Sequence, residues 1–127
     1  TEEARQVAQY ENSVIKFEDS QHEYADMSEP SFILAANAQN SYNKESEDFA
    51  SIVNNELKKG PSKRGYGVRQ AGFYVLHGAS MPNILLETAF MSNKSDEKRL
   101  KSKSFHREIA KSICDAIIKF KEKYEEE

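Results

Sequence analysis

The stretch MPNILLETAF, residues 81–90, places one carboxylate inside a run that is otherwise typical of a buried strand. The run has the length of a strand and ends before polar residues. Glu87 comes directly after its apolar residues Ile84, Leu85 and Leu86. A glutamate just past a strand end usually has its carboxylate in water. A carboxylate at the tip of a buried strand can instead act as a general base beside a substrate. The local sequence allows both interpretations of Glu87.

The composition indicates one soluble domain. The chain has 127 residues, of which 38% are hydrophobic and 31% are charged, with a net charge of −3. Because basic and acidic residues are mixed along the chain, no binding to nucleic acid or to a membrane surface is predicted. No apolar run approaches the roughly 20 residues of a spanning helix. The only cysteine, Cys114, excludes an intramolecular disulfide and a cysteine-based zinc cluster.

Helical spacing of apolar residues predicts most of the remaining elements. Residues 1–15 and 31–59 show this spacing, and Gly60-Pro61 is typical of a helix end. Ser95, followed by two acids, predicts a short helix that reaches Leu100. The strongest periodicity belongs to the last helix, in which six residues are predicted to share one buried face. They are Phe105, Ile109, Ile113, Ile117, Phe120 and Tyr124.

Two strands are predicted in the second half of the chain. The first is AGFYVL, residues 71–76, and the second ends at Glu87. The link HGASMP, residues 77–82, is too short for a parallel crossover, so the two strands should pair antiparallel. Because two strands rarely make a stable sheet, we expect a second copy of the chain, or an upstream segment, to complete the exposed edge.

Residues 64–100, RGYGVRQAGFYVLHGASMPNILLETAFMSNKSDEKRL, carry a resemblance to a known family. The pattern is a basic residue, then Gly-Val-Arg-Gln-Ala-Gly-Phe, a short link with Met-Pro, and a strand that ends Glu-Thr-Ala-Phe before Ser-Asn. It resembles the C-terminal half of the zinc-dependent N-acetylmuramoyl-L-alanine amidases, which cut peptide stems from the murein glycan. More loosely, residues 105–120 are similar to the family's last helix, and residues 8–19 to an upstream stretch of longer members.

The resemblance implies an α/β fold, with a central, mostly parallel or mixed sheet covered by helices on both faces. Residues 1–127 would then be only the C-terminal part of a single amidase domain. The family's catalytic acid/base, which faces a zinc-bound water, matches Glu87. Arg69 and Gln70 match positions before the penultimate strand, and they are candidate contacts to the peptide stem.

The family's zinc ligands are two histidines and a glutamate on motifs that are expected upstream of this chain. The three histidines present, His22, His77 and His106, lack the spacing of metal ligands, so no metal ligand is predicted here. We therefore expect zinc as the cofactor, with its ligands upstream. The chain by itself should not hydrolyse murein.

Residues 16–40 are predicted to be an insert of the kind found in longer family members, some of which use it to occlude the zinc. An acidic side chain in or near this segment would suit the open coordination position of the metal. A solvated acidic loop is the alternative interpretation. The candidate regulatory residues are Glu11, Glu18, Glu23, Asp26 and Glu29.

The function implied is hydrolysis of the amide bond between N-acetylmuramic acid and L-alanine by a zinc-activated water, with Glu87 as general base. The alternative is a non-catalytic module that binds murein or a partner on an amidase-like scaffold. Peptidoglycan is the expected partner, together with an activator protein. A periplasmic or extracellular location in the cell envelope follows from that substrate.

Overall fold

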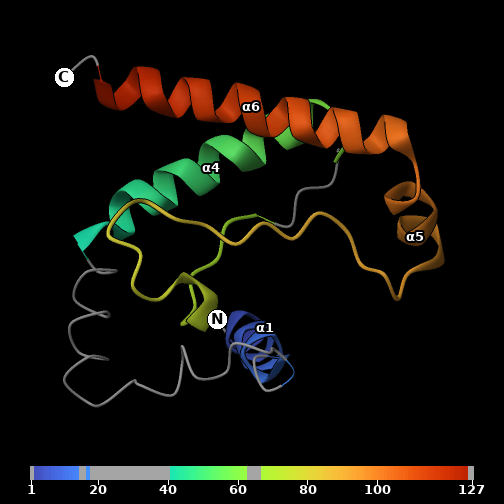
Figure 1. The fold of residues 1–127 in the computed structure, drawn as a ribbon, viewed down its shortest axis with the longest axis horizontal. Coiled ribbons are helices and arrows are strands. Elements are labelled where there is room, and N and C mark those ends of the chain that lie inside the picture. The colour runs from blue at the N-terminus through green and yellow to red at the C-terminus, as the bar shows by residue number, and fades with distance from the viewer. Residues whose placement is uncertain (1, 15–16, 18–40, 63–66, 126–127) are drawn as a thin grey trace. The chain divides into compact units, whose positions relative to one another are not determined.

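The computed structural model describes residues 2–14, 17, 41–62 and 67–125 of the chain. Its elements, shown in Figure 1, are α1 (Glu2–Val14), α4 (Asn43–Lys59), the 3-10 turn η2 (Tyr74–Leu76), α5 (Lys94–Leu100) and α6 (Lys103–Glu125). The chain divides into two compact units. One combines Thr1–Ser46 with Arg69–Asn83, and the other combines Glu47–Val68 with Ile84–Glu127.

The predicted α/β fold with a central sheet is wrong, because none of the described residues lies in a β-strand. Residues 71–76 contain the turn η2, after which the N–H of His77 donates to the carbonyl of Tyr74 (2.9 Å). Residues 84–90 are drawn as an extended run without strand pairing (Figure 1). A strand is held by hydrogen bonds to a neighbouring strand. An apolar composition indicates only that a segment is buried, and does not indicate what it pairs with. The predicted antiparallel pairing is therefore wrong as well.

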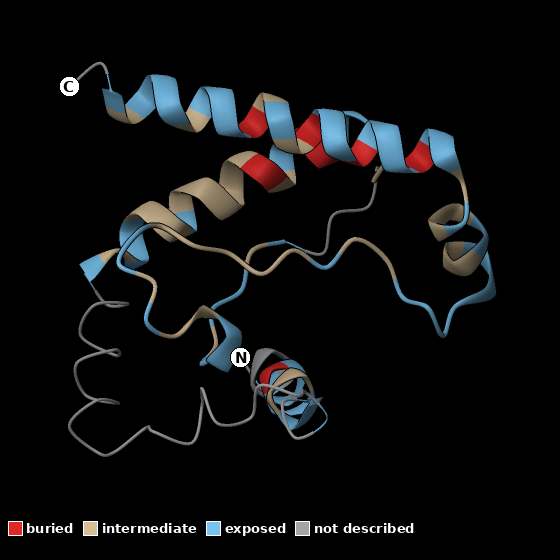
Figure 2. Ribbon diagram, in the orientation of Figure 1, coloured by how far each residue is buried: buried red, intermediate tan, exposed pale blue. Residues whose placement is uncertain are grey.

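The core of the second unit lies between α4 and α6. Val53 and Leu57 on α4 pack against buried residues of α6, including Ala116, which is fully buried. Figure 2 shows the buried positions where these two helices face each other. The predicted helix end at Gly60-Pro61 is confirmed, because α4 stops at Lys59 and the N–H of Ser62 donates back to the carbonyl of Leu57 (2.9 Å). The N-terminal part of the predicted helix, residues 31–40, lies outside the described residues.

The face of α6 that packs on α4 differs from the predicted stripe in its middle, where Ser112 and Ala116 are buried and the predicted Ile113 is only half-buried. Phe105 and Ile109 are buried as expected, but Ile117 is 49% exposed and Ala116 takes the place predicted for it. Each four-residue step moves a residue about 40° around the helix, so the third such step from Phe105 carries Ile117 off the buried face. The buried face instead alternates steps of three and four residues. Cys114 lies on the exposed side of α6.

An aromatic cluster holds the C-terminal part of α6 against the start of α4. The ring centroid of Phe120 is 5.0 Å from that of Phe49 and 4.6 Å from that of Tyr124. The hydroxyl of Tyr124 and the ammonium of Lys123 both donate to one carboxylate oxygen of Asp48, each at 2.6 Å. These contacts join α6 to α4 at a second place, beyond the buried core, and so fix how the two helices cross.

The short helix α5 forms as predicted and reaches Leu100, but its cap is Asn93 rather than Ser95. The side-chain oxygen of Asn93 accepts from the backbone N–H groups of Ser95 (2.9 Å) and Asp96 (3.2 Å). An asparagine three residues before an acid is a common helix start, because both can satisfy N–H groups of the first turn.

In the first unit, the predicted helix at the N-terminus is confirmed as α1. Ala8 is buried in this helix, at 5% exposure, whereas Val7 and Val14 are 40% and 42% exposed. Among the described helices, none combines the length and the apolar character that a membrane span requires.

Candidate functional site

Glu87 lies on an extended segment, and residues just before it pack on the helical core. Ile84 and Leu86 contact the α4–α6 cluster. Glu87 follows these residues directly, and its side chain is exposed. The core therefore holds the backbone of the segment while the carboxylate remains accessible.

Asp96 on α5 holds the C-terminal end of this segment. One of its carboxylate oxygens accepts from the backbone N–H of Phe90 (3.2 Å), and the other is 3.2 Å from the guanidinium of Arg99. Arg99 also donates to the carbonyl of Pro61 and lies 4.5 Å from the ring centroid of Phe105. One arginine thus connects the end of α4, the start of α6 and the carboxylate that fixes the segment after Glu87.

The sequence motif did not reveal these two residues as supports of Glu87. The local pattern indicates Asp96 only as an acid in the first turn of a helix, and it indicates no role for Arg99. The signal present in the sequence is the i, i+3 spacing of Asp96 and Arg99, because this spacing lets the two side chains meet on a helix.

The candidate substrate contacts Arg69 and Gln70 are both exposed. They belong to the first unit, whereas Glu87 belongs to the second. Their role as substrate contacts stays a prediction.

Of the candidate regulatory residues, only Glu11 is described, as a half-buried residue of α1. Glu18, Glu23, Asp26 and Glu29 lie outside the described residues, as does most of the predicted insert, residues 16–40.

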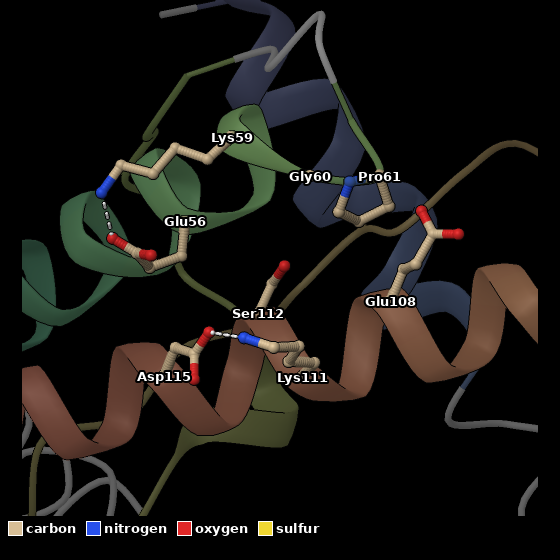
Figure 3. A pocket seen from close by; sticks show the side chains of 8 residues that line it. All are labelled: Glu56, Lys59, Gly60, Pro61, Glu108, Lys111, Ser112 and Asp115. Carbon is tan, nitrogen blue, oxygen red and sulfur yellow. Dashed lines mark hydrogen bonds and ion pairs between the residues drawn. The ribbon is translucent and has the colours of Figure 1, made fainter.

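The charged residues of the second unit also line a small hollow of about 190 Å³ between the end of α4 and α6 (Figure 3). Its lining residues are Glu56, Lys59, Gly60, Pro61, Glu108, Lys111, Ser112 and Asp115. The helices approach closely here, since a Cβ atom on Gly60 would lie 3.3 Å from the Oγ of Ser112. Lys111 is paired with Asp115 at 2.7 Å.

Glu56 is the buried charge beside this hollow, and it is neutralised by two lysines. Its Oε1 accepts from Lys119 (2.6 Å) and from Lys59 (2.7 Å). These hydrogen bonds, that of Lys119 first and that of Lys59 second, hold the pKa of Glu56 below its ordinary value. The same contact raises the pKa of Lys119. A carboxylate so paired is a structural link between α4 and α6 rather than a base available to a substrate.

Glu56→Gln should therefore destabilise the fold at neutral pH and much less in acid. Because the pKa is lowered in the folded state, the stabilisation is complete above the ordinary pKa of a glutamate and is lost as the pH falls through the lowered value. Melting temperatures of parent and variant, measured from pH 7 down to about 3, should converge at the acid end. Glu122→Gln, an exposed change on α6, is the control. A difference between parent and Glu56→Gln that is the same at every pH would contradict the assignment.

The sequence profile of the N-acetylmuramoyl-L-alanine amidase family matches residues 10–119. The chain belongs to this family. The amidase motif identified in the sequence, residues 64–100, lies inside the matched range, and so does Glu87.

Individual amidases show the same relationship. The chain is similar to the N-acetylmuramoyl-L-alanine amidase AmiC of Escherichia coli O6:H1, with 44% identity over 54% of this chain and 16% of the relative. AmiC of Neisseria meningitidis is 47% identical over 42% of this chain and 13% of the relative. LytC of Bacillus subtilis is 33% identical over 59% of this chain and 15% of the relative. The chain thus spans less than a fifth of the length of these relatives. No solved structure matches it significantly.

The amidase family is generally zinc-dependent, but the described side chains do not fit a zinc site. Across residues 2–14, 17, 41–62 and 67–125, no three His, Cys, Asp or Glu residues are grouped so that they could hold a metal ion. His77 instead lies 5.7 Å from Tyr74, ring centroid to ring centroid, and His106 contacts the carbonyl of Leu100. His22 lies outside the described residues.

Proposed function

We propose that this protein hydrolyses the amide bond between N-acetylmuramic acid and L-alanine in peptidoglycan, with Glu87 as the general base. The observation that carries the proposal is the family match over residues 10–119. AmiC and LytC, two of the relatives, are named for this activity. Since peptidoglycan lies outside the cytoplasmic membrane, the proposal places the protein in the cell envelope.

The chemistry requires one group that takes a proton from the attacking water and returns a proton to the leaving nitrogen. An exposed carboxylate on a fixed backbone suits this role, and Glu87 has both properties. The water oxygen forms a bond to the amide carbon while one of its protons passes to Glu87. The C–N bond then breaks, and the same proton passes to the amine of L-alanine, which regenerates the carboxylate.

Zinc would be held by residues other than those described, in line with the resemblance of this chain to the C-terminal half of the domain. No step above is assigned to a zinc ligand within the described segments, because they contain no cluster that fits one. What they supply, in this proposal, is the base and the segment that carries it.

Arg69 and Gln70 are proposed to contact the peptide stem of the substrate. A guanidinium binds carboxylates through paired N–H groups, and the side-chain amide of glutamine can donate to or accept from a peptide group. Both side chains are exposed. Their expected contribution is binding rather than chemistry.

The test is the identity of the bond that is cut. Protein of full natural length is incubated with purified murein, and the soluble products are analysed by mass spectrometry. We expect stem peptides that begin with a free L-alanine amino group, together with glycan strands of unchanged length. Shortened glycan strands would reject the amidase reaction. Retention on murein without release of peptide would favour the non-catalytic binding module.

A further inference from the structure

Asn12 on α1 makes an unusual pair of contacts with a distant part of the chain. Its side-chain nitrogen donates to the carbonyl of Gly72 (2.8 Å), and its side-chain oxygen accepts from the backbone N–H of Tyr74 (2.8 Å). The three residues belong to the same compact unit. One amide therefore satisfies a backbone acceptor and a backbone donor that lie two residues apart.

This arrangement is the one that a neighbouring strand would supply. In an extended chain the carbonyl of one residue and the N–H of the residue two further on point to the same side, and a paired strand normally satisfies both. The side chain of Asn12 takes over this role at the start of η2. An amide supplies a donor and an acceptor on two separate atoms, whereas a carboxylate has no donor and an aliphatic side chain has neither group.

The face of α1 that carries Asn12 also carries a buried residue. Ala8 lies one turn before Asn12 on α1 and is buried, with 5% exposure. Residues four apart share a helix face, so Ala8 and Asn12 together define the face of α1 that is turned inward. Exposed apolar residues such as Tyr10, at 72% exposure, lie on the other side.

Gly72 follows Gln70 by two residues and Arg69 by three, so the contact restrains the backbone directly after both candidate substrate contacts. We propose that Asn12 is a positioning residue of the amidase, which holds the backbone of Gly72 and Tyr74 so that Arg69 and Gln70 meet the peptide stem. The inference rests on the proposed function. It adds a residue of α1 whose own side chain touches backbone rather than substrate.

The first experiment compares Asn12→Asp with Gln9→Glu in protein of full natural length. Each variant replaces an amide by a carboxylate on α1, but only Asn12 donates to Gly72, and Gln9 is exposed. The readouts are kcat and KM for a soluble N-acetylmuramoyl peptide. We expect KM to rise about tenfold in Asn12→Asp with kcat unchanged, because losing a hydrogen bond that restrains the backbone beside a binding residue weakens substrate and transition-state binding alike. Gln9→Glu should leave both parameters unchanged.

A double-mutant cycle with Arg69→Ala and Gln70→Ala separates positioning from simple stability. If Asn12 acts through these residues, its effect on KM should be much smaller once they are removed. An Asn12→Asp effect of the same size in every background would overturn the inference, as would an unchanged KM. Asn12→Ser, which adds no charge, replaces Asn12→Asp in the same cycle if the latter does not fold.

The cycle also separates the assignment of Arg69 and Gln70 as substrate contacts from the positioning role of Asn12. If neither Arg69→Ala nor Gln70→Ala changes KM, the assigned substrate contacts are wrong, and the inference fails with them. If either raises KM while Asn12→Asp does not, the substrate contacts stand and only the role of Asn12 is rejected.

Discussion

Ile109→Ala should lower the free energy of unfolding by about 2–5 kcal/mol, the usual cost of removing most of an isoleucine side chain from a packed core. Ile109 is 9% exposed and belongs to the cluster that joins α6 to Val53 and Leu57 of α4. The close approach of the two helices near Gly60 and Ser112 leaves little freedom to collapse onto the cavity. Chemical denaturation followed by circular dichroism gives the value.

Ile118→Ala is the matched control, because it makes the same change on the same helix at a residue that is 49% exposed. It should cost about 1 kcal/mol or less. The gain in helix propensity on changing isoleucine to alanine is common to both variants, so their difference reports burial alone. Equal losses at positions 109 and 118 would show that the face of α6 assigned to the core is wrong.

The helices were predictable because their signals are local. The end of α4 at Lys59 follows from the glycine and proline after it. The presence of the short helix α5, which reaches Leu100, follows from the acids in its first turn. The inward face of α6 was right at Phe105 and Ile109 and wrong at Ile117. That error came from extending a four-residue step that a 3.6-residue helix does not keep.

The strands were not predictable from the same kind of signal. Residues 71–76 and 84–90 have the apolar composition of strands, but pairing depends on a partner that composition does not specify. In the described structure the first run forms η2 and is restrained by Asn12, and the second packs Ile84 and Leu86 on helices. Asn12 lies within residues 8–19, yet nothing in its local spacing indicates a contact some sixty residues away.

Glu87→Gln should reduce murein turnover by about 10²- to 10⁴-fold, the usual contribution of a positioned general base. Glutamine nearly preserves the volume of the side chain but cannot accept a proton from water at neutral pH. The fold should not change, because Ile84 and Leu86 make the packing contacts of the segment and the Glu87 side chain is exposed. If Glu87 were only a solvated glutamate, the change would leave the rate as it was.

The most direct measurement is the rate at which Glu87→Gln and Glu122→Gln release stem peptides from purified murein, each compared with the parent protein of full natural length. Both variants remove one exposed carboxylate, and Glu122 lies beyond the matched residues 10–119. Bound zinc and a melting curve, recorded for every protein, show that only the acid-base group has changed. We predict that Glu122→Gln keeps the parental rate while Glu87→Gln loses at least about 100-fold at equal zinc content and melting temperature. Parental turnover by Glu87→Gln would contradict the assignment of Glu87 as the catalytic base.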